Sequence, residues 1–311
     1  MFRRICLILA NEGFIGLFRR IILRLHLAPV PPDVKEGVDK EKKAYIELRE
    51  TFLKKAVELG YGDLSRYYWY HTIDLGRGLV TPGAFDHRPV LSTYCFPKDM
   101  SGMRVLDIGA HSGFFTFEFE KRGADVTSVE LPSLFEIDVP VEEDRERALK
   151  EHMAELKCQS IDELYHFILD GPFQFCRKAL NSKIKRAYSN IYNVNAGNVG
   201  TDFDLVYIGD VLLHTISPFK ALAAVAPLCK KTLMISQEFY NSASPDPVMR
   251  YLGEDKRCIR WWGTWWYPNL ICMERMLKRL GFKSVKVVGS AKFYSRTDKC
   301  YYEPIHIVAT K

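Results

Sequence analysis

The chain of 311 residues is long enough for one large or two modest domains with a substantial core. Its hydrophobic content of 47% and charged content of 26% are ordinary for a soluble globular protein, and a net charge of +6 is too small to indicate a dedicated nucleic-acid binder. The eight cysteines show neither Cys-x-x-Cys nor a paired Cys/His spacing. This pattern argues against a zinc site and a disulfide framework, so we expect no metal and a reducing, cytoplasmic location.

The N-terminal segment 1–28 is basic and apolar. It contains five arginines and a single acid, Glu12, and the apolar run 5–10 is too short for a signal-peptide core or a transmembrane span. Apolar side chains recur at helical spacing through this segment, at Phe14, Leu17, Phe18, Ile21, Ile22 and Leu25. Such a basic amphipathic helix either lies on a membrane surface, as a peripheral contact, or packs its apolar stripe against a partner or the rest of this protein.

A helix is predicted next, over residues 40–59, after a stiff proline-rich linker at 28–33. Its apolar positions share one side, and Gly60 ends it. We therefore expect a helical N-terminal region with a substrate-side lead-in over 1–98, followed by a second domain over 99–311.

Beyond Pro97 the sequence alternates between strand and helix patterns, which predicts an α/β fold with a parallel sheet covered on both faces. Cofactors bind such sheets outside the carboxyl ends of the strands. Strands are predicted at 104–108, 124–130, 189–194, 203–208, 231–237, 283–288 and 302–309. Helices are predicted at 113–122, 142–156, 218–227 and 269–280. The charged segment 141–186 is longer than a crossover helix needs, so it is predicted to be an insertion.

The stretch from Arg104 to Phe114 reads as a buried strand that enters a glycine turn at the start of a helix. A dinucleotide-binding turn requires glycine at its first, third and sixth positions, which here are Gly109, His111 and Phe114. Only one of the three fits, so a nicotinamide dinucleotide is excluded as the ligand.

The Asp107-x-Gly109-x-x-x-Gly113 turn, with Glu130 ending the next apolar run, resembles class I S-adenosylmethionine-dependent methyltransferases. The resemblance implies a Rossmann-like sheet, mostly parallel with an antiparallel last strand, and S-adenosyl-L-methionine as the cofactor. It also implies that the turn accommodates the amino-acid end of the cofactor and that Glu130 accepts the ribose hydroxyls. Carboxylate oxygens suit a vicinal diol because they can accept both hydrogen bonds.

Three further stretches, 67–76, 81–87 and 204–218, resemble the subgroup of methyltransferases similar to the tRNA wobble-uridine carboxymethyltransferases. The likeness spans about 67–309 without the insertion. Carried over position by position, it implies that Val194 and Asn195 lie beside the adenine. The other cofactor-lining positions that it implies, with those of the glycine turn, are Asp107, Gly109, Ala110, Gly113, Glu130, Leu131, Pro132, Gly209 and Asp210.

Three departures from that subgroup concern the carboxylated cofactor that the tRNA enzymes use. Their lysine is replaced by Ala84, their tyrosine before the fourth-strand histidine by Leu213, and their last-strand arginine by Pro304. An extra carboxylate would be left without partners, at a cost of roughly several kcal/mol. We therefore expect ordinary S-adenosylmethionine and disfavour a tRNA acceptor.

Methyl transfer requires alignment of the acceptor and, for an oxygen acceptor, removal of a proton. His214 and His71 are the candidate catalytic residues, with Asp86 and Glu238 as further candidates. His214 could equally be a packing or capping residue, and His71 could belong to an aromatic core. Asp210 and His111 are expected to shape the site.

The stretch from Arg260 to Pro268 contains four tryptophans. It forms either a stacking wall for a planar or sugar substrate or a buried plug over the sheet.

Together these features predict a methyltransferase that acts on a small-molecule or glycan-type acceptor. The alternatives are an RNA-modifying methyl or carboxymethyl transferase, since aromatic side chains also stack on unpaired bases, and an inactive cofactor-binding partner subunit. The oligomeric state stays open.

Overall fold

The computed structural model describes residues 32–242, 244–252 and 263–311, and the chain divides after Ile46 into two compact units. Helix α2, Pro32–Glu58, begins earlier than predicted, at a proline whose fixed φ suits the first helical turn. The amphipathic helix predicted around 14–25 lies outside the described residues. None of the helices in the described ranges has the length and hydrophobicity needed to cross a bilayer.

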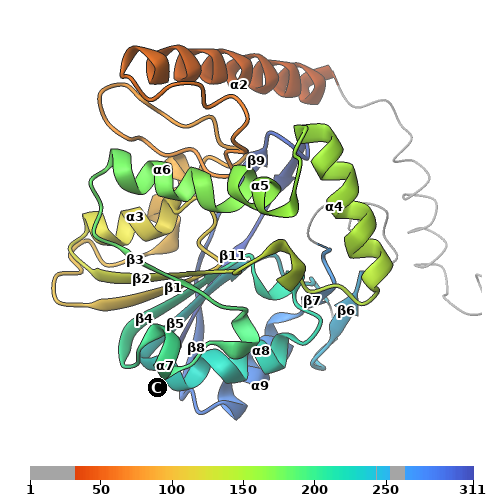
Figure 1. Cartoon of the computed structure of the whole chain (residues 1–311). Helices are drawn as coiled ribbons and strands as arrows, with labels where there is room; N and C mark the ends of the chain where they lie inside the picture. The colour runs from red at the N-terminus through yellow and green to blue at the C-terminus, as the bar shows by residue number, and fades with distance from the viewer. Residues whose placement is uncertain (1–31, 243, 253–262) are drawn as a thin grey trace, which may run out of the picture. The chain divides into compact units, whose positions relative to one another are not determined.

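The larger unit, 47–311, is built on a seven-stranded sheet with the order β3-β2-β1-β4-β5-β11-β8 (Figure 1). Strand β11 is antiparallel to both of its neighbours, and the remaining pairs are parallel. This confirms the predicted mostly parallel sheet with an antiparallel last strand. The strands are β1 Arg104–Ile108, β2 Asp125–Glu130, β3 Lys185–Tyr188, β4 Phe203–Gly209, β5 Cys229–Gln237, β8 Ser284–Ser290 and β11 Ile305–Thr310.

Helices lie on both faces of this sheet, as the strand–helix alternation predicted. They are α3 Phe114–Lys121, α4 Glu142–Leu156, α5 Ile161–Tyr165, α6 Gly171–Ala179, α7 Ala196–Val199, α8 Pro218–Val225 and α9 Leu270–Arg279. Two small antiparallel pairs accompany the sheet: β6 Met249–Tyr251 with β7 Trp266–Pro268, and β9 Phe293–Ser295 with β10 Cys300–Tyr302.

The strand predicted at 189–194 is wrong. Strand β3 ends at Tyr188, and Ile191–Asn193 forms a 3-10 turn that Asn190 caps by accepting from the Tyr192 N–H at 3.0 Å. The apolar residues of 189–194 pack into the core although they lie in a turn. A short apolar run in the sequence looks the same whether it forms such a turn or a buried strand. The predicted insertion 141–186 is also too long by two residues, because Lys185 and Arg186 belong to β3.

The residues that follow α2 contain no helix between 61 and 87. They form a loop that is held by isolated bridges between His71 and Phe85 and between Asp74 and Val80, and a 3-10 helix follows at Arg88–Tyr94. This stretch packs into the same core as the sheet, since Trp69 and Tyr94 are buried there. The predicted boundary at 98/99 stays a prediction.

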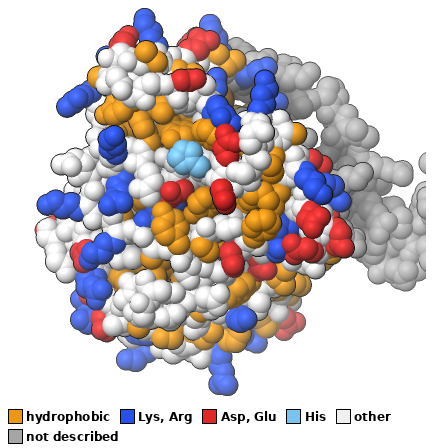
Figure 2. Space-filling model, viewed as in Figure 1, with side chains coloured by type: hydrophobic (Ala, Val, Ile, Leu, Met, Phe, Trp, Pro, Cys, Tyr) orange, Lys and Arg blue, Asp and Glu red, His pale blue; other side chains and the backbone are white. Residues whose placement is uncertain are grey.

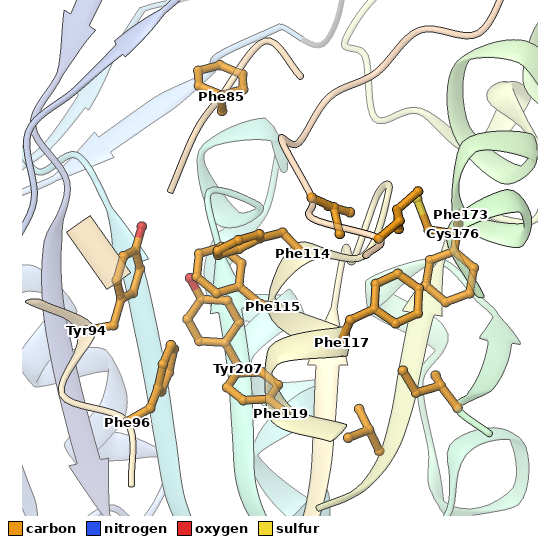
Figure 3. Close-up of a cluster of buried hydrophobic side chains, with 14 of the residues drawn as sticks. Phe85, Tyr94, Phe96, Phe114, Phe115, Phe117, Phe119, Phe173, Cys176 and Tyr207 are labelled. Carbon is orange, nitrogen blue, oxygen red and sulfur yellow. The ribbon is translucent and has the colours of Figure 1, made fainter. Parts of the chain in front are cut away.

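Alternation along the central strands assigns side chains to two cores. Val105 of β1 faces the core under α3 and α6, whereas its neighbour Leu106 faces the core under α8 and α9. The first core is unusually aromatic: Phe115, Phe117 and Phe119 of α3 pack with further rings from β4 and α6 (Figure 3). The start of α3 is therefore fixed by large side chains on several sides.

Gly113 precedes α3 with φ +94°, and a Cβ there would lie 2.6 Å from the Phe117 ring and 2.9 Å from Phe173. We expect Gly113→Ala to destabilise the fold by about 2–5 kcal/mol, because left-handed strain adds to overpacking. The matched control is Gly102→Ala, which has φ +75° and nothing within 4 Å of the new Cβ. Urea unfolding should show a clearly larger loss for Gly113→Ala, and equal losses would contradict the packing argument.

Candidate functional site

A cavity of about 430 Å³ lies at the carboxyl ends of the parallel strands. Its walls come from the turns after β1, β2, β3 and β4, from the loop around Tyr70, and from the β9–β10 hairpin. In open α/β sheets this edge is where ligands bind, and the volume is within the range of small-molecule sites.

The turn after β1 is shaped by its first glycine and by a buried acid. Gly109 has φ +72°, and a Cβ on it would lie 2.4 Å from Cγ2 of Val211. Asp107 is buried and accepts a hydrogen bond from the Thr116 hydroxyl. Burial raises the pKa of Asp107 to about 7. Both residues line the cavity.

Glu130 ends β2 with its carboxylate buried in the cavity wall. Its Oε2 accepts from the His111 N–H at 2.8 Å, and its Oε1 accepts from the Leu131 N–H at 2.9 Å. Burial raises the pKa of Glu130. Each carboxylate oxygen has a second lone pair, so the two backbone bonds orient the group and leave it able to accept hydroxyls.

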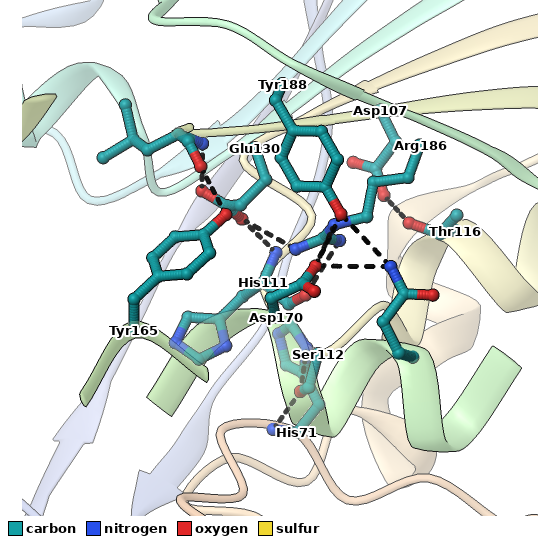
Figure 4. Close-up of polar contacts among 12 residues, drawn as sticks. His71, Asp107, His111, Ser112, Thr116, Glu130, Tyr165, Asp170, Arg186 and Tyr188 are labelled. Atoms are coloured by element: carbon teal, nitrogen blue, oxygen red, sulfur yellow. Dashed lines mark hydrogen bonds and ion pairs between the residues drawn. The ribbon is translucent and has the colours of Figure 1, made fainter. Parts of the chain in front are cut away.

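Arg186 is the functional neighbour that the sequence analysis missed (Figure 4). Its side chain is 1% exposed, with Nη2 3.9 Å from Glu130 and Nε 3.4 Å from Asp170. Nη1 donates to the His111 carbonyl at 3.2 Å, and the guanidinium lies 3.8 Å from the centre of the Phe173 ring. A buried arginine on an edge strand has the same sequence signature as an exposed one, so no local signal reveals it.

His71 lies within a cluster of rings beside the cavity. The His111 ring is stacked on Tyr70 with centroids 4.1 Å apart, and His71 packs against their edges. Nδ1 of His71 is 3.5 Å from the Phe114 N–H and 3.2 Å from the Ser112 hydroxyl. Because a backbone N–H only donates, Nδ1 is the acceptor and the proton is on Nε2. Burial lowers the pKa of His71 well below its usual value, so this histidine is neutral and suited to donate.

His214 has the opposite tautomer. Its Nδ1 lies 3.1 Å from the carbonyl oxygen of Gly263, which can only accept, so Nδ1 carries the proton. Of the two ring nitrogens, Nε2 is therefore the one that would accept a proton in general base catalysis. His214 lines the cavity.

Two further acids come from the ends of β4 and β5. Asp210 has φ +50°, an uncommon conformation for a residue with a side chain, and burial together with Glu238 raises its pKa to about 7. Glu238 accepts from the Tyr267 hydroxyl at 2.9 Å. Both acids line the cavity, whereas Asp86 is outside its lining and is paired with Arg88 at 2.7 Å.

Most of the residues predicted to contact the cofactor do line the cavity: Asp107, Gly109, Ala110, Glu130, Leu131, Gly209 and Asp210. Gly113 is outside the lining and packs against Phe117 and Phe173 at the start of α3. Pro132 is also outside the lining and is exposed. Val194 is buried in the second core, and Asn195 caps α7 by accepting from the Gly197 N–H.

The cavity lining after β3 comes from residues just before Val194 and Asn195. Because β3 ends at Tyr188, the residues beyond its carboxyl end are those at 189–192, and these line the cavity instead. At the carboxyl end of β3, the cavity is therefore lined by Ser189, Asn190, Ile191 and Tyr192.

The Asp, Glu, Lys and Arg side chains that line the cavity are all acidic among the described residues. Seven carboxylates line it, and among the described lining residues there is no lysine or arginine. These acids are Asp107, Glu130, Glu136, Asp138, Asp210, Glu238 and Asp298. On the face shown in Figure 2, acidic side chains and a histidine lie among hydrophobic ones, with most lysines and arginines toward the rim. Such walls favour a cation and disfavour an anion.

The three departures noted in the sequence add no positive charge. Ala84 is fully buried, Leu213 lines the cavity, and Pro304 is buried near the sheet. Arg296 lies near Ala84, but its guanidinium donates to Thr72 and to the Gly83 carbonyl.

The tryptophan stretch is described from Gly263 onward, and its first two tryptophans lie outside the described residues. Trp265 is buried with its Nε1 donating to the Asp138 carbonyl at 2.9 Å, and Trp266 donates to the Ile216 carbonyl at 3.0 Å. Neither ring lines the 430 Å³ cavity. These two side chains therefore support the 430 Å³ cavity without lining it, and the choice between a stacking wall and a plug stays a prediction.

Comparisons with known proteins agree with this architecture. No protein-family model and no curated protein sequence matches the chain. Among solved structures, the N-terminal domain of EvdMO1 with SAH bound is similar, with a TM-score of 0.53 at 13% identity over 84% of this chain and 96% of that one. The same domain in the presence of SAH and D-fucose gives 0.53 at 14% identity over the same shares of the two chains.

Magnesium protoporphyrin IX methyltransferase (ChlM) from Synechocystis PCC 6803, with bound SAH, is more distant, with a TM-score of 0.43 at 12% identity over 72% of this chain and 80% of that one. At such identities the likeness to EvdMO1 establishes the fold. The larger unit has the Rossmann-like fold of a methyltransferase domain.

The buried cation Arg186 leads to a prediction about stability. We expect Arg186→Met to lower the free energy of unfolding by about 3–5 kcal/mol, because Glu130 and Asp170 would then lack their shared counter-charge. Arg186→Lys keeps the charge and should cost less. Urea unfolding of the three proteins checks this, and a Met variant as stable as the wild type would contradict the assigned role.

Proposed function

We propose that the protein is an S-adenosylmethionine-dependent methyltransferase that acts on an uncharged small-molecule acceptor. The observation that carries the proposal is the cavity itself: a glycine turn, an oriented Glu130 and seven carboxylates, with no lysine or arginine among the described residues that line it. The similarity of the fold to a domain solved with SAH bound supports the same cofactor.

The residues present fit the ribose, the adenine and the cationic groups of that cofactor. Glu130 offers lone pairs to the ribose hydroxyls, and Ser189–Tyr192 supply polar and apolar groups where the adenine would lie. Asp107 and Asp210 offer negative charge to the ammonium and sulfonium groups. When bound, S-adenosylmethionine supplies a methyl group that its sulfonium makes electrophilic.

The chain's own contribution to the reaction is alignment and proton transfer. His214 lines the cavity with its Nδ1 bonded to the Gly263 carbonyl, and we assign it the removal of the proton from an acceptor hydroxyl. Asp210 and Glu238 line the same cavity as His214 and can orient the hydroxyls of an acceptor through hydrogen bonds. The Nε2–H of His71 is a donor, so we assign it a positioning role rather than that of a base.

Sugars are the first acceptor class to test. Carboxylates and tyrosine hydroxyls bind neutral polyols well, and the EvdMO1 domain was solved in the presence of D-fucose. The phosphate backbone of RNA would meet carboxylates in this cavity, which disfavours the RNA alternative. The inactive-subunit alternative predicts cofactor binding without transfer to any acceptor.

Calorimetric titration tests the cofactor. We expect S-adenosylmethionine to bind more tightly than its carboxylated analogue, because the cavity offers the extra carboxylate no lining lysine or arginine among the described residues. Tighter binding of the carboxylated form would overturn this choice and make tRNA the acceptor to test. Failure of both to bind would remove the cofactor assignment.

Glu130→Gln tests the ribose site. A glutamine amide places one NH₂ against a backbone N–H, so we expect S-adenosylmethionine to bind about tenfold to a hundredfold more weakly. Glu136→Gln is the matched control, since Glu136 is an exposed carboxylate at the rim of the same cavity. Equal effects of the two substitutions would contradict a specific role for Glu130.

The raised pKa values of Asp107 and Asp210 predict a pH dependence. Both carboxyls are largely neutral below pH 7 and become anionic above it, since the pKa of each is about 7. The affinity ratio of S-adenosylmethionine to SAH, which lacks the sulfonium charge, should therefore rise about tenfold between pH 6 and pH 8. Asp210→Asn should flatten the rise. A ratio independent of pH in the wild type would show that these acids do not face the sulfonium.

A further inference from the structure

A second, smaller cavity of about 190 Å³ lies beside the first and is lined mainly by aliphatic side chains. Its apolar walls are Leu134, Ile137, Val139, Pro140, Val141, Ala148, Leu149, Leu164, Ile168 and Trp265. We propose that it is a subsite for an uncharged apolar group of the acceptor, either one aromatic ring or a short alkyl chain. This inference rests on the proposed methyltransferase function.

The two cavities meet along shared segments of chain. Ile137 lines both, and the next residues diverge: Asp138 faces the carboxylate cavity while Val139 faces the apolar one. The same division occurs at 263–265, where Thr264 lines the carboxylate cavity and its two neighbours line the apolar one. A ligand in the first cavity thus has the second as its neighbouring space, past Ile137.

The shared wall is tied to the candidate base. Trp265 donates from its backbone N–H to the Leu213 carbonyl at 2.8 Å and from its indole to Asp138 at 2.9 Å. Gly263, which lines the apolar cavity, accepts from His214. An acceptor whose hydroxyl is near His214 would therefore have its adjoining part at the entrance to the apolar cavity.

The size and chemistry of the second cavity select the occupant. An apolar cavity of roughly 150 Å³ accommodates benzene, so this one suits a single ring or a chain of similar size. At its border Arg145 lies 2.6 Å from Glu142 and donates to the Ile137 carbonyl at 3.1 Å, so both terminal nitrogens of its guanidinium are engaged. A charged substituent would lose its hydration among mainly aliphatic walls.

Fluorobenzene, observed by ¹⁹F NMR, tests the subsite in the full-length protein. We expect saturable binding to the wild type, and binding about tenfold weaker or absent for Ala148→Leu, whose larger side chain occupies the cavity. Ala154→Leu is the matched control, because Ala154 is exposed on the same helix outside the lining and should leave binding unchanged.

Titration with S-adenosylmethionine separates this inference from the proposed function. Fluorobenzene that stays bound when S-adenosylmethionine saturates the protein supports a distinct subsite, and its displacement overturns the inference. Absence of fluorobenzene binding, or equal binding to Ala148→Leu, also overturns it while S-adenosylmethionine still binds. Loss of S-adenosylmethionine binding to the wild type would instead remove the proposed function.

Discussion

The arrangement of the site depends on one carboxylate, Glu130, and the two backbone N–H groups that hold it. The His111 N–H comes from the turn after β1 and the Leu131 N–H from the turn after β2, so a single side chain fixes two loops of the cavity against each other. Arg186 extends this connection into the segment between β2 and β3 through Asp170. The segment predicted to be an insertion is therefore part of the support of the site.

A buried carboxylate of this kind is stable only with compensation, since burial disfavours its charged form. Two backbone donors and a nearby guanidinium supply that compensation here. The contacts that stabilise the charge of Glu130 also fix the orientation of its carboxylate toward the cavity. The position that we propose for ribose binding is therefore also central to the fold.

The fold was largely predictable from the sequence because its signals are local. A β-strand, a glycine with positive φ and an acid at the end of the next strand appear within residues 104–130. The strand β3 was not predictable in place, since its own residues Lys185–Tyr188 are mostly polar or charged while the apolar run after it forms a turn. The adenine contacts at Val194 and Asn195, which the family resemblance implied, stay a prediction, while the cavity lining after β3 comes from residues 189–192.

The cavity's charge is a property of the assembled molecule that no single motif indicates. Asp138, Asp210 and Asp298 come from three distant loops, and only the fold gathers them without a lining lysine or arginine among the described residues. Composition pointed the other way, because the chain as a whole has a net charge of +6. Local field and net charge are thus separate quantities, and ligand choice follows the local one.

Under the proposed function, this local field acts on each participant in the reaction. It favours the sulfonium form of the cofactor over its neutral product, which supports exchange of product for a fresh cofactor, and it disfavours anionic acceptors such as a phosphate backbone. The apolar cavity next to it adds a preference for uncharged surface. An acceptor that meets both conditions is neutral, hydroxylated at one end and apolar at the other, so both the charge of the first cavity and the size of the second restrict what the site accepts.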